Sequence, residues 1–223
     1  MNRARCAARG FAGTGIASVF PSEYETNFMA ERELTAADWR GYSEAQFPQG
    51  SWSLDDNVLR ALAGGPPVDL ITRERFRDFT LCFEWRLPRA GNSGVLYRVD
   101  EQLEHAWQSG PEMQLLDDEH TSDGANALTS CGALYGLIAP WRDQREVANT
   151  YHSARLIVQG SRVQHWIDDT QVLGYDLESE ELKERIARSK FREWPQFARL
   201  QEGHIALQHH GTEAWFRRLR IDA

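Results

Sequence analysis

The sequence predicts an all-β protein, built as a sandwich of two antiparallel sheets with one short helix at its surface. Short segments in which apolar and polar residues alternate recur along the chain, as expected of strands with one buried face. Turn-forming residues separate these segments at short intervals. Only one segment has helical periodicity, whereas a parallel α/β fold needs a helix after nearly every strand. These observations favour the sandwich.

The clearest predicted strand spans residues 79–87, where five large apolar residues occupy every second position and polar or small residues lie between them. One face of this strand is therefore expected in the core. An Asp-Asp-Asn turn between two apolar runs predicts a hairpin over 52–59. Further strands are predicted at 94–99, 112–116, 155–160, 163–167, 204–208 and 214–221.

The segment 178–190 breaks the strand pattern. Leu182 and Ile186 lie four residues apart, and acidic residues precede basic ones at the same spacing. Residues four apart are neighbours on a helix surface, where opposite charges stabilise each other. The segment is predicted to be the short surface helix.

The strand pattern places a single domain at residues 34–223, a length that suits one large β domain. Residues 1–33 lack a steady period and are predicted to be an N-terminal tail or a segment that wraps the domain. Glycine and threonine interrupt the apolar stretch that follows the first arginines, so a signal peptide is not indicated. A cytoplasmic location is therefore favoured over a periplasmic one.

Charge and composition limit the partners. The chain has 33 acidic and 25 basic residues and a formal charge of −8, so it does not attract phosphate backbones or anionic lipid. No stretch approaches the roughly 20 apolar residues that span a bilayer. Eight tryptophans, six tyrosines and ten phenylalanines suit sheet packing and also stacking on sugars. We expect a small carbohydrate as partner, with no nucleic acid and no membrane; the sequence does not indicate an oligomeric state.

Polar side chains on the outer faces of predicted strands form the candidate site. Alternation places Glu112 and Gln114 on one face of their strand, and His204 and Gln208 on one face of another. One such residue alone is more often a solvated or ion-paired surface residue, but several on adjacent strands favour a groove in which they converge. The other candidates for this groove are Glu84 and Arg98 from further strands and His120 from a loop.

The polar stretch 117–130 is long for a hairpin connection, and long loops of this kind are often functional. Its carboxylates, with His120, could bind a divalent cation, although their spacing is not that of an EF-hand. A divalent cation is therefore a hypothesis only, and no cofactor is predicted. Sequence motifs for nucleotide binding, for a serine nucleophile or for a zinc protease are missing.

Five segments, read in order, carry a family resemblance. They are Asn-Ser-Gly-Val-Leu-Tyr-Arg at 92–98, Glu-Met-Gln-Leu-Leu-Asp at 112–117, Gly-Ala-Leu-Tyr-Gly-Leu-Ile-Ala-Pro at 132–140, Ser-Lys-Phe at 189–191 and Gly-His-Ile-Ala-Leu-Gln-His-His-Gly at 203–211. The set resembles the 3-keto-disaccharide hydrolase family, also described as the 3-keto-glucoside 1,2-lyase and 3-keto-2-hydroxy-glucal hydratase domain. Each motif alone is weak, but the ordered set, from about residue 34 to 221, is fairly specific.

The resemblance implies a concanavalin A-like jelly roll and glucoside substrates that are already oxidised at C3. The implied chemistry is removal of the C2 proton, loss of the C1 substituent and addition of water. It requires a general base, donors or a cation for the enolate oxygen, and an acid for the leaving group. The implied residues are Glu112 as base, His204 or His120 as acid or proton shuttle, and Glu84, Arg98, Gln114, Tyr135 and Gln208 for substrate binding.

The chain departs from the family pattern at several positions. His209 stands where an aspartate is usual, Asp168-Asp169 where Asn-Gly is usual, and Arg217-Arg218 where Arg-Asn is usual. The surroundings of Tyr151 also differ. If the missing aspartate holds a cation or orients a catalytic group, substrate choice is altered or activity is lost.

Two other functions are compatible with the same residues. A two-carboxylate glycosidase would use Glu84 and Glu112, about 5–5.5 Å apart if retaining and about 6.5–9.5 Å if inverting. A carbohydrate-binding module would bind sugar without catalysis. Activity on unoxidised disaccharides that is lost in Glu112→Gln would favour the first of these, and sugar binding without turnover that survives Glu112→Gln and His204→Ala would favour the second.

Overall fold

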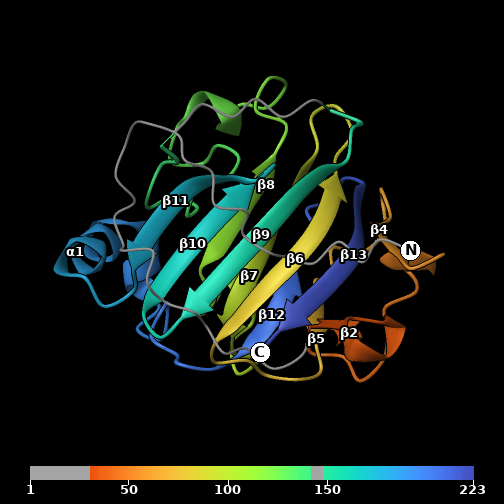
Figure 1. Ribbon diagram of the computed structural model, residues 1–223, viewed down its shortest axis with the longest axis horizontal. Helices are drawn as coiled ribbons and strands as arrows, with labels where there is room; N and C mark the ends of the chain where they lie inside the picture. The colour runs from red at the N-terminus through yellow and green to blue at the C-terminus, as the bar shows by residue number, and fades with distance from the viewer. Residues whose placement is uncertain (1–30, 142–147) are drawn as a thin grey trace.

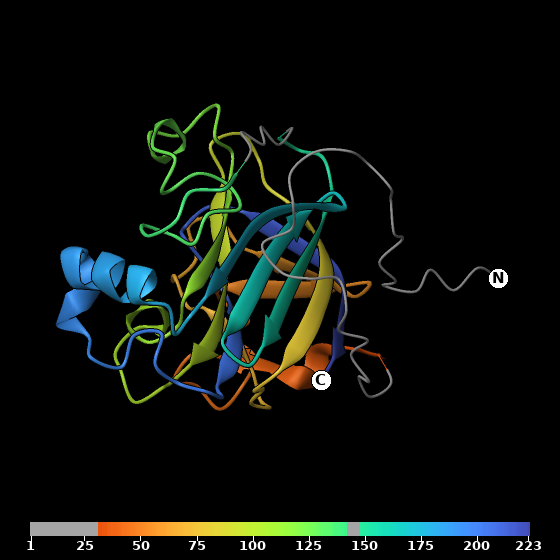
Figure 2. The same cartoon turned by 60° about the vertical axis from the view of Figure 1, so that its left-hand side comes forward.

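The computed structural model describes residues 31–141 and 148–223 of the chain. Within these residues, a pair of antiparallel sheets packs face to face as a sandwich, with the helix α1 (Glu180–Arg188) at one side (Figures 1 and 2). The all-β prediction with one surface helix is confirmed. No helix among the described residues is both long and apolar enough to cross a bilayer.

The larger sheet lies in front in Figure 1. In spatial order its strands are β11 (Thr170–Asp176), β10 (Arg162–Ile167), β9 (His152–Gln159), β6 (Phe79–Arg86), β13 (Ala214–Asp222), β4 (Val58–Ala61) and β3 (Trp52–Asp55), and β1 (Arg32–Glu33) pairs with β13. Residues 1–30 of the predicted N-terminal segment lie outside the described residues. The domain begins slightly before residue 34, because Arg32 and Glu33 already pair with Ile221 and Arg220.

The smaller sheet lies behind the larger one in Figure 1. In spatial order its strands are β2 (Trp39–Gly41), β5 (Leu70–Thr72), β12 (His204–Leu207), β7 (Asn92–Val99) and β8 (Glu112–Leu116). The described connections contain short 3-10 helices: η1 (Ala36–Asp38), η2 (Ala106–Gln108), η3 (Asp123–Ala125) and η4 (Lys190–Glu193).

The main core lies between the sheets. The apolar face of the 79–87 segment is buried, as its alternation predicts, and Phe79 and Leu81 are fully inaccessible. A second, small cluster of Ile71, Leu96 and Ala206 lies on the opposite face of the smaller sheet, with Val99 and Ala106. This outer cluster supports the loops that cover that face.

Local sequence explains the turns and the helix. The hairpin of β3 and β4 turns at Asp56 and Asn57, both with positive φ, as a tight two-residue turn requires. The side chain of Ser179 accepts a hydrogen bond from the amide of Leu182 and so caps the first turn of α1. The guanidinium of Arg185 in α1 also donates to the carbonyl of Leu137, which ties the helix to the loop beside β8.

The pairing of β7 with β12 contains a bulge. His204 lies opposite Val99 and Ala206 opposite Leu96, so β7 has one extra residue, and Arg98 adopts a φ of 53° there. The neighbouring backbone is very close to it: a Cβ on Gly203 would lie 2.4 Å from the carbonyl carbon of Arg98. The bulge therefore requires glycine at position 203.

We expect Gly203→Ala to lower the free energy of unfolding by about 1–3 kcal/mol, because backbone would have to move to admit the methyl group. Urea unfolding of the purified variant measures this. Gly50→Ala is the control: nothing lies within 4 Å of a Cβ at Gly50, so its stability is expected within about 0.5 kcal/mol of the parent. Equal stability of the two variants would contradict the close approach.

Candidate active site

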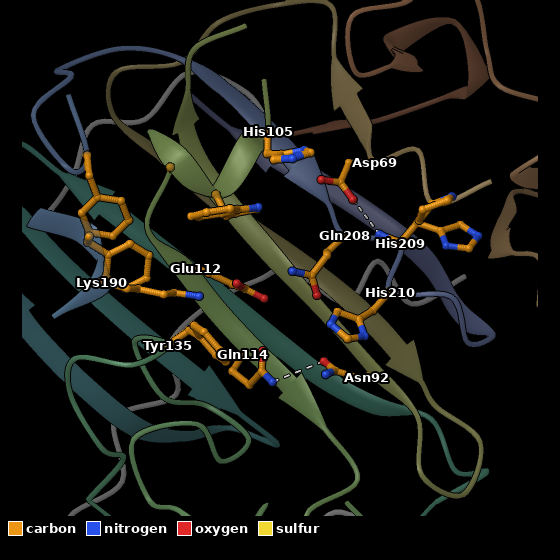
Figure 3. Close-up of a pocket in the computed structure, with 15 residues that line it drawn as sticks. Asp69, Asn92, His105, Glu112, Gln114, Tyr135, Lys190, Gln208, His209 and His210 are labelled. Atoms are coloured by element: carbon orange, nitrogen blue, oxygen red, sulfur yellow. Dashed lines mark hydrogen bonds between the residues drawn. The ribbon is translucent and has the colours of Figure 1, made fainter. Parts of the chain in front are cut away.

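A pocket of about 300 Å³ lies on the outer face of the smaller sheet (Figure 3). Glu112 and Gln114 line it, and they alternate along β8 with the core residues Met113 and Leu115, so the pocket faces away from the larger sheet. The lining side chains are Pro67, Asp69, Asn92, His105, Trp107, Glu112, Gln114, Tyr135, Lys190, Phe191, Phe197, Gln208, His209 and His210.

Strand register brings the polar residues together. Leu207 pairs with Leu70, so the next positions along these strands, Gln208 and Asp69, are neighbours across β12 and β5. On the other side, the amide of Gln208 donates to the carbonyl of Gly94, which pairs with Gln114. Asp69, Gln208, Gly94 and Gln114 therefore form one row across four strands.

Glu112 lies over this row. A Cβ built on Gly94 would come within 2.0 Å of the Oε1 atom of Glu112, so the carboxyl group occupies the space that a side chain would fill. The residue is only 6% exposed, and its Oε1 has no hydrogen-bond partner in the described part of the chain. Burial, with a smaller contribution from Asp69, raises the pKa of Glu112 to about 8.

Asp69 is the second carboxyl group of the pocket. Its Oδ1 accepts a hydrogen bond from the backbone amide of His209, at 2.8 Å. Burial raises the pKa of Asp69 to about 7, although this hydrogen bond opposes the shift. The pocket thus contains two carboxyl groups that both hold protons more strongly than exposed ones.

Lys190 supplies positive charge. Its Nζ atom lies 5.0 Å from the ring centre of Trp107, 4.8 Å from that of Tyr135 and 5.2 Å from that of Phe191. In Figure 3 the amine points toward the carboxyl group of Glu112, whose pKa its charge lowers. Trp107 also packs edge-on against Trp194, with ring centres 4.5 Å apart. The aromatic rings therefore hold the lysine on one side of the pocket.

Amide side chains form the opposite side. The amide nitrogen of Gln114 donates to Asn92 Oδ1 at 3.3 Å, and Figure 3 shows this bond below Gln208. The Oε1 atoms of Gln114 and Gln208 are buried and have no partner among the described residues. Buried acceptors without donors are unusual in proteins. These two, with Glu112 Oε1, suit a ligand rich in hydroxyl groups.

The two histidines after β12 have different positions. The ring of His209 is turned away from the carboxyl groups: its Nε2 lies 3.2 Å from the carbonyl of Leu62, and it packs edge-on against Trp52. The amide of Gly211 donates to its Nδ1, so the ring is neutral, and burial lowers its pKa. His210 is exposed, and its ring lies beside Asn92 and Gln208 (Figure 3). The strand ends at Leu207, so both residues can line the pocket without alternation.

Of the residues predicted from sequence, the pocket brings together Glu112, Gln114, Tyr135 and Gln208. The expected convergence with Glu84 and Arg98 is corrected by the structure. Glu84 lies on β6 of the other sheet, where its carboxylate binds Arg217 at 2.7 Å and Arg218 at 2.5 Å. The bulge removes Arg98 from the alternation of β7, and its guanidinium donates instead to the carbonyls of Gly160 and Arg77. Glu84 and Glu112 do not form a carboxylate pair.

The two histidines predicted as acid or shuttle also lie outside the pocket. His204 is on the same sheet face as Gln208 but four residues along the strand, so their backbone positions are about 13 Å apart. The Nδ1 atom of His204 lies 2.7 Å from the carbonyl of Thr72. His120 Nδ1 is 2.8 Å from Asp117 Oδ2, in the loop beyond β8. Within residues 31–141 and 148–223, no group of three or more His, Cys, Asp or Glu side chains could hold a metal ion.

Sequence reasoning missed Asp69, Lys190, Trp107 and His210. Lys190 stands in a segment that carries the family resemblance, so its position could have been suspected. Asp69 follows a Gly-Gly-Pro-Pro loop and precedes a strand of only three residues, so it is easily taken for a turn residue. Only the pairing of β5 with the distant β12 reveals its place.

Comparison with known proteins places the chain in a family. The sequence model of the family described as the 3-keto-alpha-glucoside-1,2-lyase-like domain matches residues 31–222. The chain belongs to this family. A 3-keto-disaccharide hydrolase from Bacteroides thetaiotaomicron is 28% identical over 213 residues, which cover 82% of this chain and 73% of the relative.

Solved structures share the fold of this chain. A candidate glycosyl hydrolase from Parabacteroides distasonis superposes with a TM-score of 0.76 at 22% identity, covering 83% of this chain and 88% of its own. A carbohydrate-binding module, CBM66 from Bacillus subtilis, superposes with a TM-score of 0.52 at 12% identity, covering 83% and 96%. The sandwich is therefore shared by proteins of differing description.

The buried carboxyl group of Glu112 makes stability depend on pH. Its pKa rises from 4.5 to about 8 on folding, so between these pH values the unfolded chain loses this proton more readily and the folded state loses stability. We expect Glu112→Gln to be more stable than the parent at pH 9, on the order of 2–4 kcal/mol, and nearly equal to it at pH 4.5. Denaturant unfolding at both pH values measures the difference.

The control for this comparison is Glu178→Gln, which changes an exposed glutamate and should follow the parent at both pH values. If Glu112→Gln also follows the parent, its carboxyl group is not buried in the way described.

Proposed function

We propose that the pocket cleaves 3-keto-glucosides, including 3-keto-disaccharides, by elimination across C1 and C2 followed by hydration. The observation that carries this proposal is the carboxyl group of Glu112, which lines the pocket and is buried over Gly94, with its Oε1 lacking a hydrogen-bond partner among the described residues. Membership of a lyase-like family and the name of the Bacteroides relative support the substrate class. The partner is a small carbohydrate; a cytoplasmic location stays a prediction.

The oxidised substrate explains why one well-placed base is enough. A ketone at C3 acidifies the hydrogen on C2, because the carbanion left by its removal is an enolate with its charge on O3. The electron pair of that enolate can then expel the substituent on C1 and form a C1–C2 double bond. Water adds to C1 of this product, and the proton returns to C2. No oxocarbenium ion is required.

Glu112 fits the role of general base. A base works best when its pKa lies near the working pH, and burial brings the pKa of Glu112 to about 8 from 4.5. Because Gly94 has no side chain, the carboxyl group can lie against the floor of the pocket with substrate above it. No donor among the described residues binds the buried Oε1, so no hydrogen bond there opposes protonation of the carboxyl group by the C2 proton.

Lys190 fits the role of enolate stabiliser. Its amine is held by three aromatic rings and points to the region of Glu112, where negative charge moves from the base to O3 of the substrate. A fixed charge in a partly water-excluded site stabilises a developing oxyanion more than a solvated charge does. Gln114 and Gln208 are left to accept hydrogen bonds from sugar hydroxyl groups, and Tyr135 forms part of the wall.

The alternative of a two-carboxylate glycosidase loses its predicted pair, because Glu84 binds two arginines on the other sheet. A binding module without catalysis needs no base with a raised pKa. Binding of sugar without catalysis is one possible outcome of the isotope experiment described next.

In D2O we expect the released 3-keto sugar to carry deuterium at C2, because the proton removed by Glu112 exchanges with solvent before it returns. Glu112→Gln should lower kcat by about 10²–10⁴-fold without loss of folding. Mass spectrometry and NMR of the products measure both effects, with product incubated alone as the control for spontaneous exchange. Cleavage without deuterium at C2 would favour a glycosidase, and sugar binding without turnover would favour a binding module.

Lys190→Met should lower kcat by about 10²–10³-fold, since it removes the charge and keeps an apolar chain between the rings. It should also shift the rise of kcat/KM with pH to higher pH, because Lys190 lowers the pKa of Glu112. Lys190→Arg keeps the charge and should leave the pH midpoint near that of the parent. An unchanged midpoint in Lys190→Met would contradict the interaction between the two side chains.

A further inference from the structure

The elimination needs a proton donor for the departing oxygen, and neither His204 nor His120 reaches the pocket. We propose that Asp69 is this general acid and that it works with Glu112 as a pair holding one proton between them. The assignment rests on the proposed function and adds to it the residue that assists the leaving group.

Register places the two carboxyl groups on either side of Gln208. Asp69 is the neighbour of Gln208 on β5, and Glu112 lies over Gly94, its neighbour on β7. Two strand spacings separate the backbone at Asp69 from Gly94, about 10 Å, and both side chains project to the same face. Figure 3 shows Asp69 and Glu112 flanking Gln208 across the pocket. A single sugar ring placed there can present C2 to one carboxyl group and the oxygen on C1 to the other.

The hydrogen bonding of Asp69 suits a donor. A backbone amide can only donate, so Oδ1, which accepts from His209, is the oxygen without the proton. The proton is left on Oδ2, which Figure 3 shows turned away from His209. No ion pair with Asp69 occurs among the described residues to hold it in the charged form, and burial raises its pKa. The pair can hold its single proton on either carboxyl group, and the reactive arrangement has the proton on Asp69 and Glu112 ionised.

The proton balance closes over one catalytic cycle. In the elimination, Glu112 takes the proton from C2, the enolate electron pair forms the C1–C2 double bond and C3 carbonyl, and the C1–O bond breaks with its electron pair on oxygen. Asp69 gives its proton to that oxygen. In the hydration, Asp69 takes a proton from water, the resulting hydroxide bonds to C1, and Glu112 returns its proton to C2. The pair ends with one proton, as it began.

His210 is the competing donor, since it also lines the pocket. His210 is exposed and its ring lies beside Asn92 and Gln208, with no hydrogen bond described for it, whereas the carboxyl group of Asp69 is held by a backbone amide. Geometry therefore favours Asp69, and the test includes both residues.

The test compares two 3-keto-glucosides, one with 4-nitrophenol and one with methanol as leaving group. Nitrophenolate leaves without protonation, whereas an alkoxide requires an acid. Because Asp69 also takes part in the hydration of both substrates, the quantity compared is the rate of leaving-group release in a single turnover. Asp69→Asn should lower this rate on the methyl substrate by about 10²–10⁴-fold and on the nitrophenyl substrate by less than about tenfold. His210→Asn should affect the two substrates equally. Asp55→Asn, an exposed site on β3, controls for the substitution itself.

Equal losses on both substrates in Asp69→Asn, or a loss selective for the methyl substrate in His210→Asn, would overturn the assignment. Thermal unfolding of Asp69→Asn checks folding, and the asparagine oxygen can still accept from His209. Failure of the proposed function looks different: the parent protein itself would then cleave neither substrate and would exchange no deuterium at C2.

Discussion

The site depends on the absence of a side chain at position 94. β7 is an inner strand of the smaller sheet, between β12 and β8, and a side chain at Gly94 would stand in the middle of the pocket floor. Without it, Glu112 lies across the sheet instead of extending into solvent. Its burial and its raised pKa follow from that position, as does its closeness to Lys190 and to the row that contains Gln208 and Asp69. The chemistry is thus a consequence of packing at one backbone position.

Two buried carboxyl groups weaken the fold at neutral and higher pH, because their ionised forms lose hydration and gain no ion pair within residues 31–141 and 148–223. These two destabilising carboxyl groups lie on the outer face of one sheet, apart from the main core between the sheets. The small cluster of Ile71, Leu96 and Ala206 lies beside the pocket on that face and supports the covering loops. The fold therefore does not need the carboxyl groups, and the site can be tuned for proton transfer.

Local pattern predicted the strands and which residues share a face, because alternation is a property of each strand alone. It placed Glu112 with Gln114, and the structure keeps both in the pocket. It could not show which strands are neighbours: Asp69 joins the site only through the pairing of β5 with β12. It also could not foresee the bulge that turns Arg98 away, or the arginines on β13 that bind Glu84. From the sequence alone, a charged residue on a strand of one sheet cannot be distinguished from a charged residue on a strand of the other sheet.

The departures from the family pattern affect conformation more than chemistry. Asp168, Asp169 and Arg218 have φ values of 44°, 60° and 53°, in the left-handed region where the usual Asn and Gly are favoured. They lie in the β10–β11 turn and a bulge of β13, outside the pocket. At position 209 the pocket uses the backbone amide, which binds Asp69, while the ring packs against Trp52. Any residue except proline supplies that amide, so histidine in place of aspartate leaves this contact, and the proposed acid, intact.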